Sequence, residues 1–413
     1  MKLRPLLCLA LIHLLVDGFA QVVTPLWPRL RDDLGLSPWT LTLVYSAWQL
    51  AASVSQPIFG CWGDRFNSRW MIALGPALGI VCISLIGLIR DPIAMTLLLV
   101  AGGLGIGAFH PEAAVGVVEA SKDRPGRGLA VFTFGGMLGL GLGPMLSGKL
   151  AAAGGLHNLV WMAPPGLLLL TVFVLVGRPA AHIASHPTAA VRLTDHVGAH
   201  WRPAGLLLSV STLRAIPALG VPLGLAFLMK ERGQSESAIG DAQSVFLLSG
   251  GLGTLLCPLF VRTGRELRAL LGLSVPAVGC LLLLAWGRPI AYYVGLAGSG
   301  LLLQGAIPIL IAYSQRLLPG GQRLAASLTL GASWGLAALI VGVLQWHFTR
   351  IAQPEGMLWA MVPFGCAAAL AIGFLPRVPS RTAIQLSGGV ETIKRVLASA
   401  GEKRKAPGEA GAG

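Results

Sequence analysis

Three ionisable residues lie deep inside long apolar stretches of the sequence: Asp17, Glu112 and Arg214. A charge at the centre of a bilayer costs roughly 2.5–3.5 kcal/mol on insertion scales, so such a residue normally faces a cavity or a partner. The protonation of a buried carboxylate responds to nearby charge, which suits Asp17 and Glu112 to carrying protons. We interpret both as proton-coupling residues, and a buried ion pair that only joins two helices is the alternative.

Arg214 and His110 are the residues that we expect to contact a substrate. Asp17 and Arg214 lie at matching depths of two apolar stretches, so they can form an ion pair if those stretches face each other. An anion that binds the guanidinium would then change the protonation of Asp17 and couple proton movement to substrate movement. His110 titrates near physiological pH, and Pro111 after it predicts a helix kink. His110 alone fits an interhelical hydrogen bond equally well.

Three further polar residues inside apolar stretches are weaker substrate-contact candidates: Gln49, Gln304 and Tyr313. Each can equally make a hydrogen bond between two helices. The cysteines lie in or beside apolar stretches, with neither a CxxC pair nor a metal-ligand spacing. The histidines between residues 178 and 203 fit no ligand template either. We therefore predict no metal and no cofactor.

Membrane helices must position these residues. Hydrophobic residues make up 54% of the 413 residues and charged residues only 12%, whereas soluble domains carry roughly 25% charge. The apolar residues fall in runs of about 20, the length that spans a bilayer core as a helix. The sequence predicts an all-α membrane protein with twelve transmembrane helices. Their ranges are 5–28, 38–61, 70–89, 92–118, 127–150, 157–177, 204–229, 238–261, 267–287, 289–315, 323–348 and 355–376.

The spans divide into two halves. We expect an N-terminal six-helix bundle over 1–177, a polar linker over 178–203, a C-terminal six-helix bundle over 204–376 and a basic tail over 377–413 whose composition predicts disorder. At one common offset, Gly35 and Ser37 correspond to Gly233 and Ser235, each pair just after a span. Such parallel repeats are typical of transporters.

The net charge of +14 does not indicate nucleic acid, because most Lys and Arg fall on the loops of one side. This bias follows the positive-inside rule and places both termini in the cytoplasm. We expect a multi-pass protein of the plasma membrane, the inner membrane of a bacterium, with the lipid bilayer as its surroundings.

The loop after the second span holds Gly60, Asp64, Arg65 and Arg69. A short charged turn can be a plain cytoplasmic anchor. The spacing also resembles the loop signature of the major facilitator superfamily. That resemblance implies that Asp64, Arg65 and Arg69 form an ion-pair latch that holds an outward-open state.

The fifth span carries Gly135, Gly139, Gly143 and Pro144. The glycines recur every four residues, so they line one helix face and permit close helix contact. Generic small-residue packing explains this spacing. The run is also similar to the superfamily's fifth-helix antiporter signature, which favours export modestly.

Across nearly the whole chain, and most strongly in its first half, the sequence resembles the fosmidomycin resistance protein branch of this superfamily. The stretches that carry the resemblance are His13–Asp17, Trp48–Ser53, Phe109–Glu112, Arg127–Ala130 and Tyr313–Gln315. It implies two pseudo-symmetric bundles that rock about a substrate near the bilayer midplane, and a proton-coupled exporter (antiporter) of small drug-like or anionic molecules. The superfamily is usually monomeric.

Two positions depart from that branch. Val261 stands where the second-half loop would carry Asp, so a latch there should be weak or absent. Arg214 is not expected in the seventh span of this branch, and its charge suits an anionic substrate.

Two other functions stay open. The first is an importer or facilitator of a small anionic metabolite on the same fold. The second is a non-transporting membrane protein, either a sensor or an enzyme. The sequence has no HExxH, no Gly-x-Ser-x-Gly and no sizeable soluble domain, so we expect no enzyme.

Overall fold

The computed structural model describes residues 2–63, 70–121, 124–177, 193–262, 264–318, 325 and 327–378. Throughout these residues the regular elements are helices and there is no strand, so the predicted all-α fold is confirmed. The first-half helices are α1 (Leu3–Gln21), α2 (Trp27–Asp33), α3 (Pro38–Ser53), α4 (Ser55–Gly63), α5 (Met71–Leu85), α6 (Pro92–Ala120), α7 (Pro125–Gly154) and α8 (Ala163–Gly177). The second-half helices are α9 (Leu193–Glu231), α10 (Glu236–Leu256), α11 (Glu266–Trp286), α12 (Pro289–Leu317), α14 (Ser333–Arg350) and α15 (Glu355–Ile372).

Eleven helices within the described residues are long and apolar enough to cross a membrane. The predicted span 38–61 is not one of them, because Val54 separates it into α3 and α4. The hydroxyls of Ser53 and Ser55 donate to the carbonyls of Gln49 and Ala51, a pattern that bends helices. Pro57 also lacks the N–H that would continue the hydrogen-bond ladder.

Three sequence predictions fall partly or wholly outside the described residues. Residues 178–192 of the predicted linker lie outside them, and α9 begins at Leu193, before the predicted end of that linker. Of the predicted tail, residues 379–413 lie outside them. The latch residues Asp64, Arg65 and Arg69 also lie outside the described residues.

The starts of α3 and α10 have matching serine caps. Ser37 at the start of α3 accepts a hydrogen bond from the Thr40 amide, and Ser235 does the same for Ala238 at the start of α10. Before each serine stands a glycine with positive φ, Gly35 at 58° and Gly233 at 70°, a conformation that glycine adopts readily. The two positions matched by the repeat offset therefore have the same local structure.

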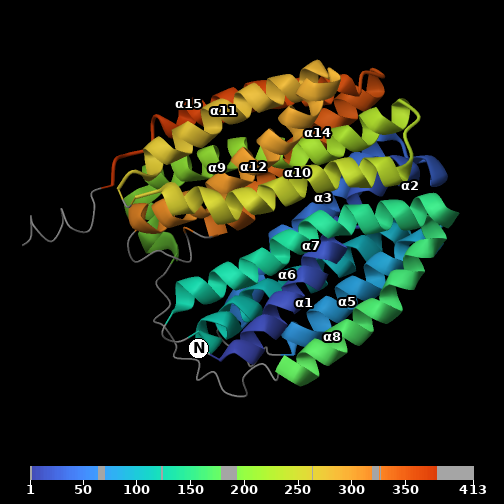
Figure 1. Ribbon diagram of the computed structural model, residues 1–413, viewed down its shortest axis with the longest axis horizontal. Coiled ribbons are helices and arrows are strands. Elements are labelled where there is room, and N and C mark those ends of the chain that lie inside the picture. Colours follow the sequence, from blue (N-terminus) through green and yellow to red (C-terminus); the bar gives the residue numbers. More distant parts are fainter. Residues whose placement is uncertain are drawn as a thin grey trace, which may run out of the picture.

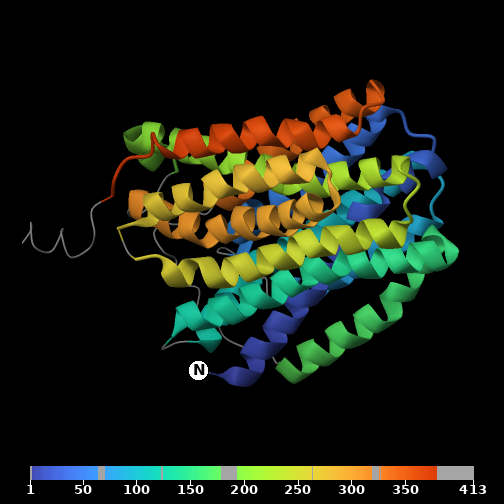
Figure 2. The same ribbon diagram turned by 45° about the horizontal axis from the view of Figure 1, so that its top comes forward.

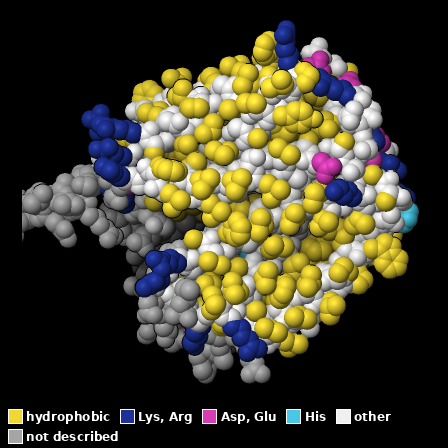
Figure 3. All heavy atoms as spheres, in the orientation of Figure 1, with side chains coloured by type: hydrophobic (Ala, Val, Ile, Leu, Met, Phe, Trp, Pro, Cys, Tyr) yellow, Lys and Arg dark blue, Asp and Glu magenta, His cyan; other side chains and the backbone are white. Residues whose placement is uncertain are grey.

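The helices form two groups that run side by side (Figures 1 and 2). Helices α1 and α5–α8 lie together, α9–α12, α14 and α15 lie together, and α3 lies between the groups (Figure 1). Helix α7 packs against α1 in its own half and α10 in the other half, while α3 packs against α14. The face in Figure 3 is apolar across its middle and carries Lys and Arg towards its ends, as expected for a protein surrounded by lipid.

Candidate functional site

Asp17 lies between two imidazole rings. Its Oδ2 is 3.1 Å from Nε2 of His13, one turn earlier on α1, and its Oδ1 is 3.2 Å from Nε2 of His110 on α6. Asp17 is 8% exposed and His13 7%. We call these three residues the Asp17 cluster. Both carboxylate oxygens are engaged, so the cluster compensates the buried acid within the first half.

Backbone carbonyls engage the other nitrogen of each ring. Nδ1 of His13 lies 2.8 Å from the carbonyl oxygen of Phe132 on α7, and Nδ1 of His110 lies 2.9 Å from that of Ile106. The His13 ring also stacks on the Phe132 ring, with centroids 3.9 Å apart. All four imidazole nitrogens therefore have a polar neighbour, which fixes both ring orientations.

Gly136 of α7 is the backbone wall of this cluster. A Cβ at this position would lie 2.6 Å from Oδ2 of Asp17 and 2.4 Å from Cε1 of His13. No side chain fits there without moving both groups, because real Cβ contacts are longer than 3 Å. The cluster thus depends on close approach of α7 to α1.

The predicted glycine signature provides that approach. A Cβ at Gly135, Gly139 or Gly143 would come within 2.1–2.2 Å of carbonyl oxygens on α1. The three glycines therefore face the α1 backbone directly. Further along α7, the carbonyl oxygen of Pro144 would lie 2.2 Å from a Cβ at Gly240 of α10. The signature residues lie where α7 packs between the two halves.

The Asp17 cluster is the one group among the described residues with the donor set of a metal site. Its ligand atoms lie within 4.8 Å of one another. The donors contact one another directly, since each imidazole Nε2 lies 3.1–3.2 Å from an oxygen of the Asp17 carboxylate.

Glu112 is buried, at 8% exposure, in α6. It follows His110 by two residues, about 200° around the helix, so it projects away from the side of α6 that contacts Asp17. The structure therefore does not place the two predicted proton-coupling carboxylates in one cluster.

Arg214 lies on α9 in the second half and is 3% exposed. Its Nη1 donates to the carbonyl oxygen of Leu303 on α12 at 3.1 Å, and its Nε is buried without a hydrogen-bond partner. No acidic group lies within ion-pair distance among the described residues. The Asp17–Arg214 ion pair that the sequence allowed is not formed in this structure, where two imidazoles contact the carboxylate of Asp17.

The weaker candidates are dispersed. Gln304 follows Leu303 on α12, is 4% exposed and has a buried Oε1 without a partner. Gln49 lies half-buried on α3. Tyr313 donates its hydroxyl to the carbonyl oxygen of Pro376 at 2.7 Å and packs in a separate core cluster with α15 and α9 residues. Gln304 is thus the candidate next in the chain to the Leu303 carbonyl that Arg214 contacts.

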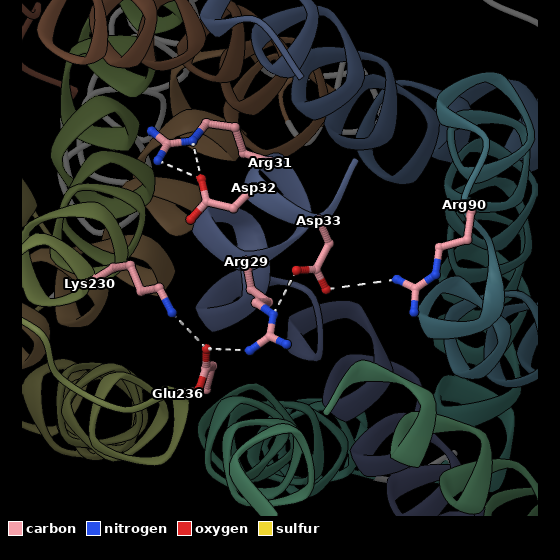
Figure 4. Close-up of polar contacts among 7 residues, drawn as sticks. All are labelled: Arg29, Arg31, Asp32, Asp33, Arg90, Lys230 and Glu236. Carbon is pink, nitrogen blue, oxygen red and sulfur yellow. Dashed lines mark hydrogen bonds and ion pairs between the residues drawn. The ribbon is translucent and has the colours of Figure 1, made fainter. Parts of the chain in front are cut away.

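A charged network lies at the end of the bundle that contains α2, opposite the N-terminal end of α1 (Figure 1). Glu236 of α10 is 3.0 Å from Lys230 of its own half and 3.6 Å from Arg29 of the first half (Figure 4). Arg29 also contacts Asp33 at 2.9 Å, and Asp33 lies 3.8 Å from Arg90. The Arg29–Glu236 contact therefore joins the two halves at this end.

Sequence reasoning singled out neither His13 nor this network as functional. His13 precedes Asp17 by four residues, a spacing that places two side chains on one helix face, so this signal was available. The i, i+4 spacing of Arg29 and Asp33 was also visible. Glu236 lies far from both in the chain, and no sequence pattern joins it to Arg29.

The comparisons with known proteins agree with this architecture. A family model of the Major Facilitator Superfamily matches residues 9–223, just over half of the chain. The chain is 26% identical to the fosmidomycin resistance protein of Escherichia coli K12, over 81% of this chain and 84% of that protein. It is 31% identical to the multidrug resistance protein MdtG of E. coli 55989, over 37% of this chain and 39% of that protein.

Solved structures show the same fold. The nucleoside transporter NupG covers 90% of this chain and 99% of its own, with a TM-score of 0.72 and 14% identity. The D-xylose-proton symporter covers 92% and 99%, with a TM-score of 0.71 and 14% identity.

Proposed function

The chain belongs to the Major Facilitator Superfamily, and from this premise we propose that it is a proton-coupled exporter, an antiporter, of small drug-like or anionic molecules. Membership makes it a membrane transporter rather than an enzyme. The observation that carries the proposal is the Asp17 cluster, a buried carboxylate held by two titratable rings. The drug-resistance names of its relatives favour export.

Asp17 and Glu112 carry the protons in this proposal. Arg214 and Gln304 provide the substrate contacts, because each keeps a buried polar atom without a partner, and such an atom is costly unless a ligand satisfies it. Gln49, half-buried on α3, stays a weaker candidate for substrate contact. His110 and Tyr313 are engaged elsewhere here and would contact substrate only after those bonds break.

The transport cycle would alternate access between the two halves. Lys and Arg gather on the loops opposite α2, so we place both termini in the cytoplasm of a bacterial cell and the α2 end outside. The Arg29–Glu236 contact then closes the outer side in this conformation. The latch of Asp64, Arg65 and Arg69 would close the inner side in the other. A monomer suffices for this cycle.

The test uses inverted membrane vesicles with fosmidomycin as the probe. A pH gradient with an acidic vesicle lumen should drive accumulation of the probe. Asp17→Asn and Glu112→Gln should each lose this dependence on the gradient, while they keep the exchange of labelled for unlabelled probe. Glu231→Gln, an exposed acid at the end of α9, is the matched control and should transport normally. Wild-type rate and stoichiometry in both site variants would overturn the coupling proposal.

The same vesicles separate export from import. If accumulation occurs only in right-side-out vesicles, the chain is an importer of an anionic metabolite, the function that the unpaired Arg214 also suits. Binding is measured separately by thermal shift, because a ligand of the native state raises its apparent stability. Arg214→Met should remove the shift produced by fosmidomycin, a phosphonate.

A further inference from the structure

We propose that the Asp17 cluster stores two exchangeable protons, one in each contact between an imidazole Nε2 and a carboxylate oxygen. This deepens the proposed function and rests on it only for the use of the protons in transport. It adds His13 to the proton-carrying residues and assigns His110 to the same role. The hydrogen-bond partners of the two rings determine how many protons the cluster holds.

The first step fixes the tautomers. A carbonyl oxygen offers only lone pairs, so a ring nitrogen that bonds to it must donate a proton. Nδ1 of His13 faces the Phe132 carbonyl at 2.8 Å, and Nδ1 of His110 faces the Ile106 carbonyl at 2.9 Å. Both Nδ1 atoms therefore carry hydrogen, and in a neutral ring Nε2 is left as a bare acceptor.

The second step counts protons. Nε2 of His13 lies 3.1 Å from Oδ2 of Asp17, and Nε2 of His110 lies 3.2 Å from Oδ1. A bare Nε2 and a bare carboxylate oxygen are both acceptors and repel at this distance, so each contact requires a proton between them. Two contacts that use different oxygens require two protons. The loaded cluster has a net charge of +1, and removal of both protons leaves −1.

The neighbouring helices offer the cluster few other titratable groups. Helix α1 packs against α5, α6, α7 and α8. The described titratable residues on those helices are Cys82, His110, Glu112, Glu119, Arg127 and Lys149. Of these, His110 is the group within ion-pair distance of Asp17. Towards α7 the cluster meets the Phe132 ring and the backbone at Gly136, so His13 and His110 are the two sites for its protons.

The stored protons also join two helices. His13 and Asp17 lie on α1, whereas His110 lies on α6 and is the more exposed of the two rings, with 22% of its side chain accessible. Loss of the His110 proton turns an attractive contact between α1 and α6 into a repulsive one. Unloading therefore changes helix packing as well as charge, which is what coupling requires.

The test counts protons without any substrate. The protein, in lipid bilayers with ¹⁵N-labelled histidine, is titrated by NMR, which distinguishes Nδ1–H, Nε2–H and doubly protonated rings. The infrared band of a protonated carboxyl, assigned with Asp17→Asn, completes the count. We expect a sum of two protons in acid and none in alkali, with Nδ1–H retained on both rings. A sum of one, or a neutral Nε2–H tautomer on either ring, would overturn the proposal.

Variants provide a second count. His13→Gln and His110→Gln should each halve the stored protons from two to one, while the exposed His157→Gln should leave two. Fosmidomycin transport measured in parallel separates the two proposals. A sum of two without proton-driven transport keeps the store and rejects the coupled exporter. Proton-driven transport with a sum of one keeps the exporter and rejects the two-proton store.

Discussion

The two halves bury charge in opposite ways. In the first half Asp17 has a titratable ring on each carboxylate oxygen, and each ring has a backbone carbonyl behind it. In the second half Arg214 is buried at least as deeply but has one backbone acceptor and a partnerless Nε. The first arrangement is complete without a ligand, whereas the second leaves a charge that an anion could neutralise. The difference suggests a division of work between proton handling and substrate binding.

The strongest way to break this comparison is to remove each charge and measure unfolding. Asp17→Leu leaves two rings facing an apolar group and should lower the free energy of unfolding by about 3–5 kcal/mol. Arg214→Met removes an unpaired charge and should raise it, on the order of 1–4 kcal/mol. Thermal unfolding in detergent at neutral pH shows whether each variant is more or less stable than the parent. If Arg214→Met is as destabilising as Asp17→Leu, Arg214 has a partner and the contrast fails.

A smaller effect tests how rigid each site is. Gly136→Ala places a Cβ against Asp17 and His13, whereas Gly250→Ala on α10 places one 2.6 Å from Cγ of Gln304, whose amide oxygen has no hydrogen-bond partner. Overpacking a rigid site costs about 1–3 kcal/mol, so Gly136→Ala should lower the melting temperature and impair proton-driven transport. Gly250→Ala should lower both less, because a shift of Gln304 breaks no hydrogen bond of its amide oxygen, whereas a shift of Asp17 or His13 disrupts the contact between them.

Equal losses in the two glycine variants would mean that both sites are equally rigid. Gly272→Ala is the matched control, since its Cβ would meet nothing within 4 Å. It should leave both the melting temperature and transport unchanged.

Apolar run length alone predicted most of the fold. Spans such as 92–118 and 289–315 match α6 and α12 to within a few residues, because a bilayer imposes both length and composition on a helix. The break at Val54 is a local effect of Ser53, Ser55 and Pro57, which a run-length argument ignores. Two serines beside a proline are a local signal for such a break.

The candidate site was predictable only in part. The cost of a buried charge identifies Asp17, Glu112 and Arg214 as unusual, but it does not name their partners. His13 was within reach, one turn from Asp17. Gly136 was not, since it is one of 55 glycines and its importance follows from how closely α7 approaches α1. Packing between distant segments decides such contacts.

The smallest effect concerns the α2 end, where the halves meet through charge. Arg29 and Lys230 both contact Glu236, but Arg29 comes from the first half and Lys230 from the second. Arg29→Gln therefore removes a contact between the halves, and Lys230→Gln removes one within a half. Partly exposed ion pairs contribute about 0.2–1 kcal/mol, enough to shift a conformational equilibrium by up to about fivefold. Both variants remove one positive charge beside Glu236, so a difference between them reports the contact between the halves rather than the loss of charge.

The measurement is labelling of a cysteine at the half-buried Gln21 by a membrane-impermeant maleimide added outside, with the native cysteines replaced by serine. Arg29→Gln should speed labelling up to about fivefold, because the outer side opens more often. Lys230→Gln should leave the rate near that of the parent, since Glu236 keeps Arg29. Equal acceleration in both would show that Glu236 acts through its own half, and the closed outer side would then depend on the glycine contacts between α7 and α10 rather than on the ion pair.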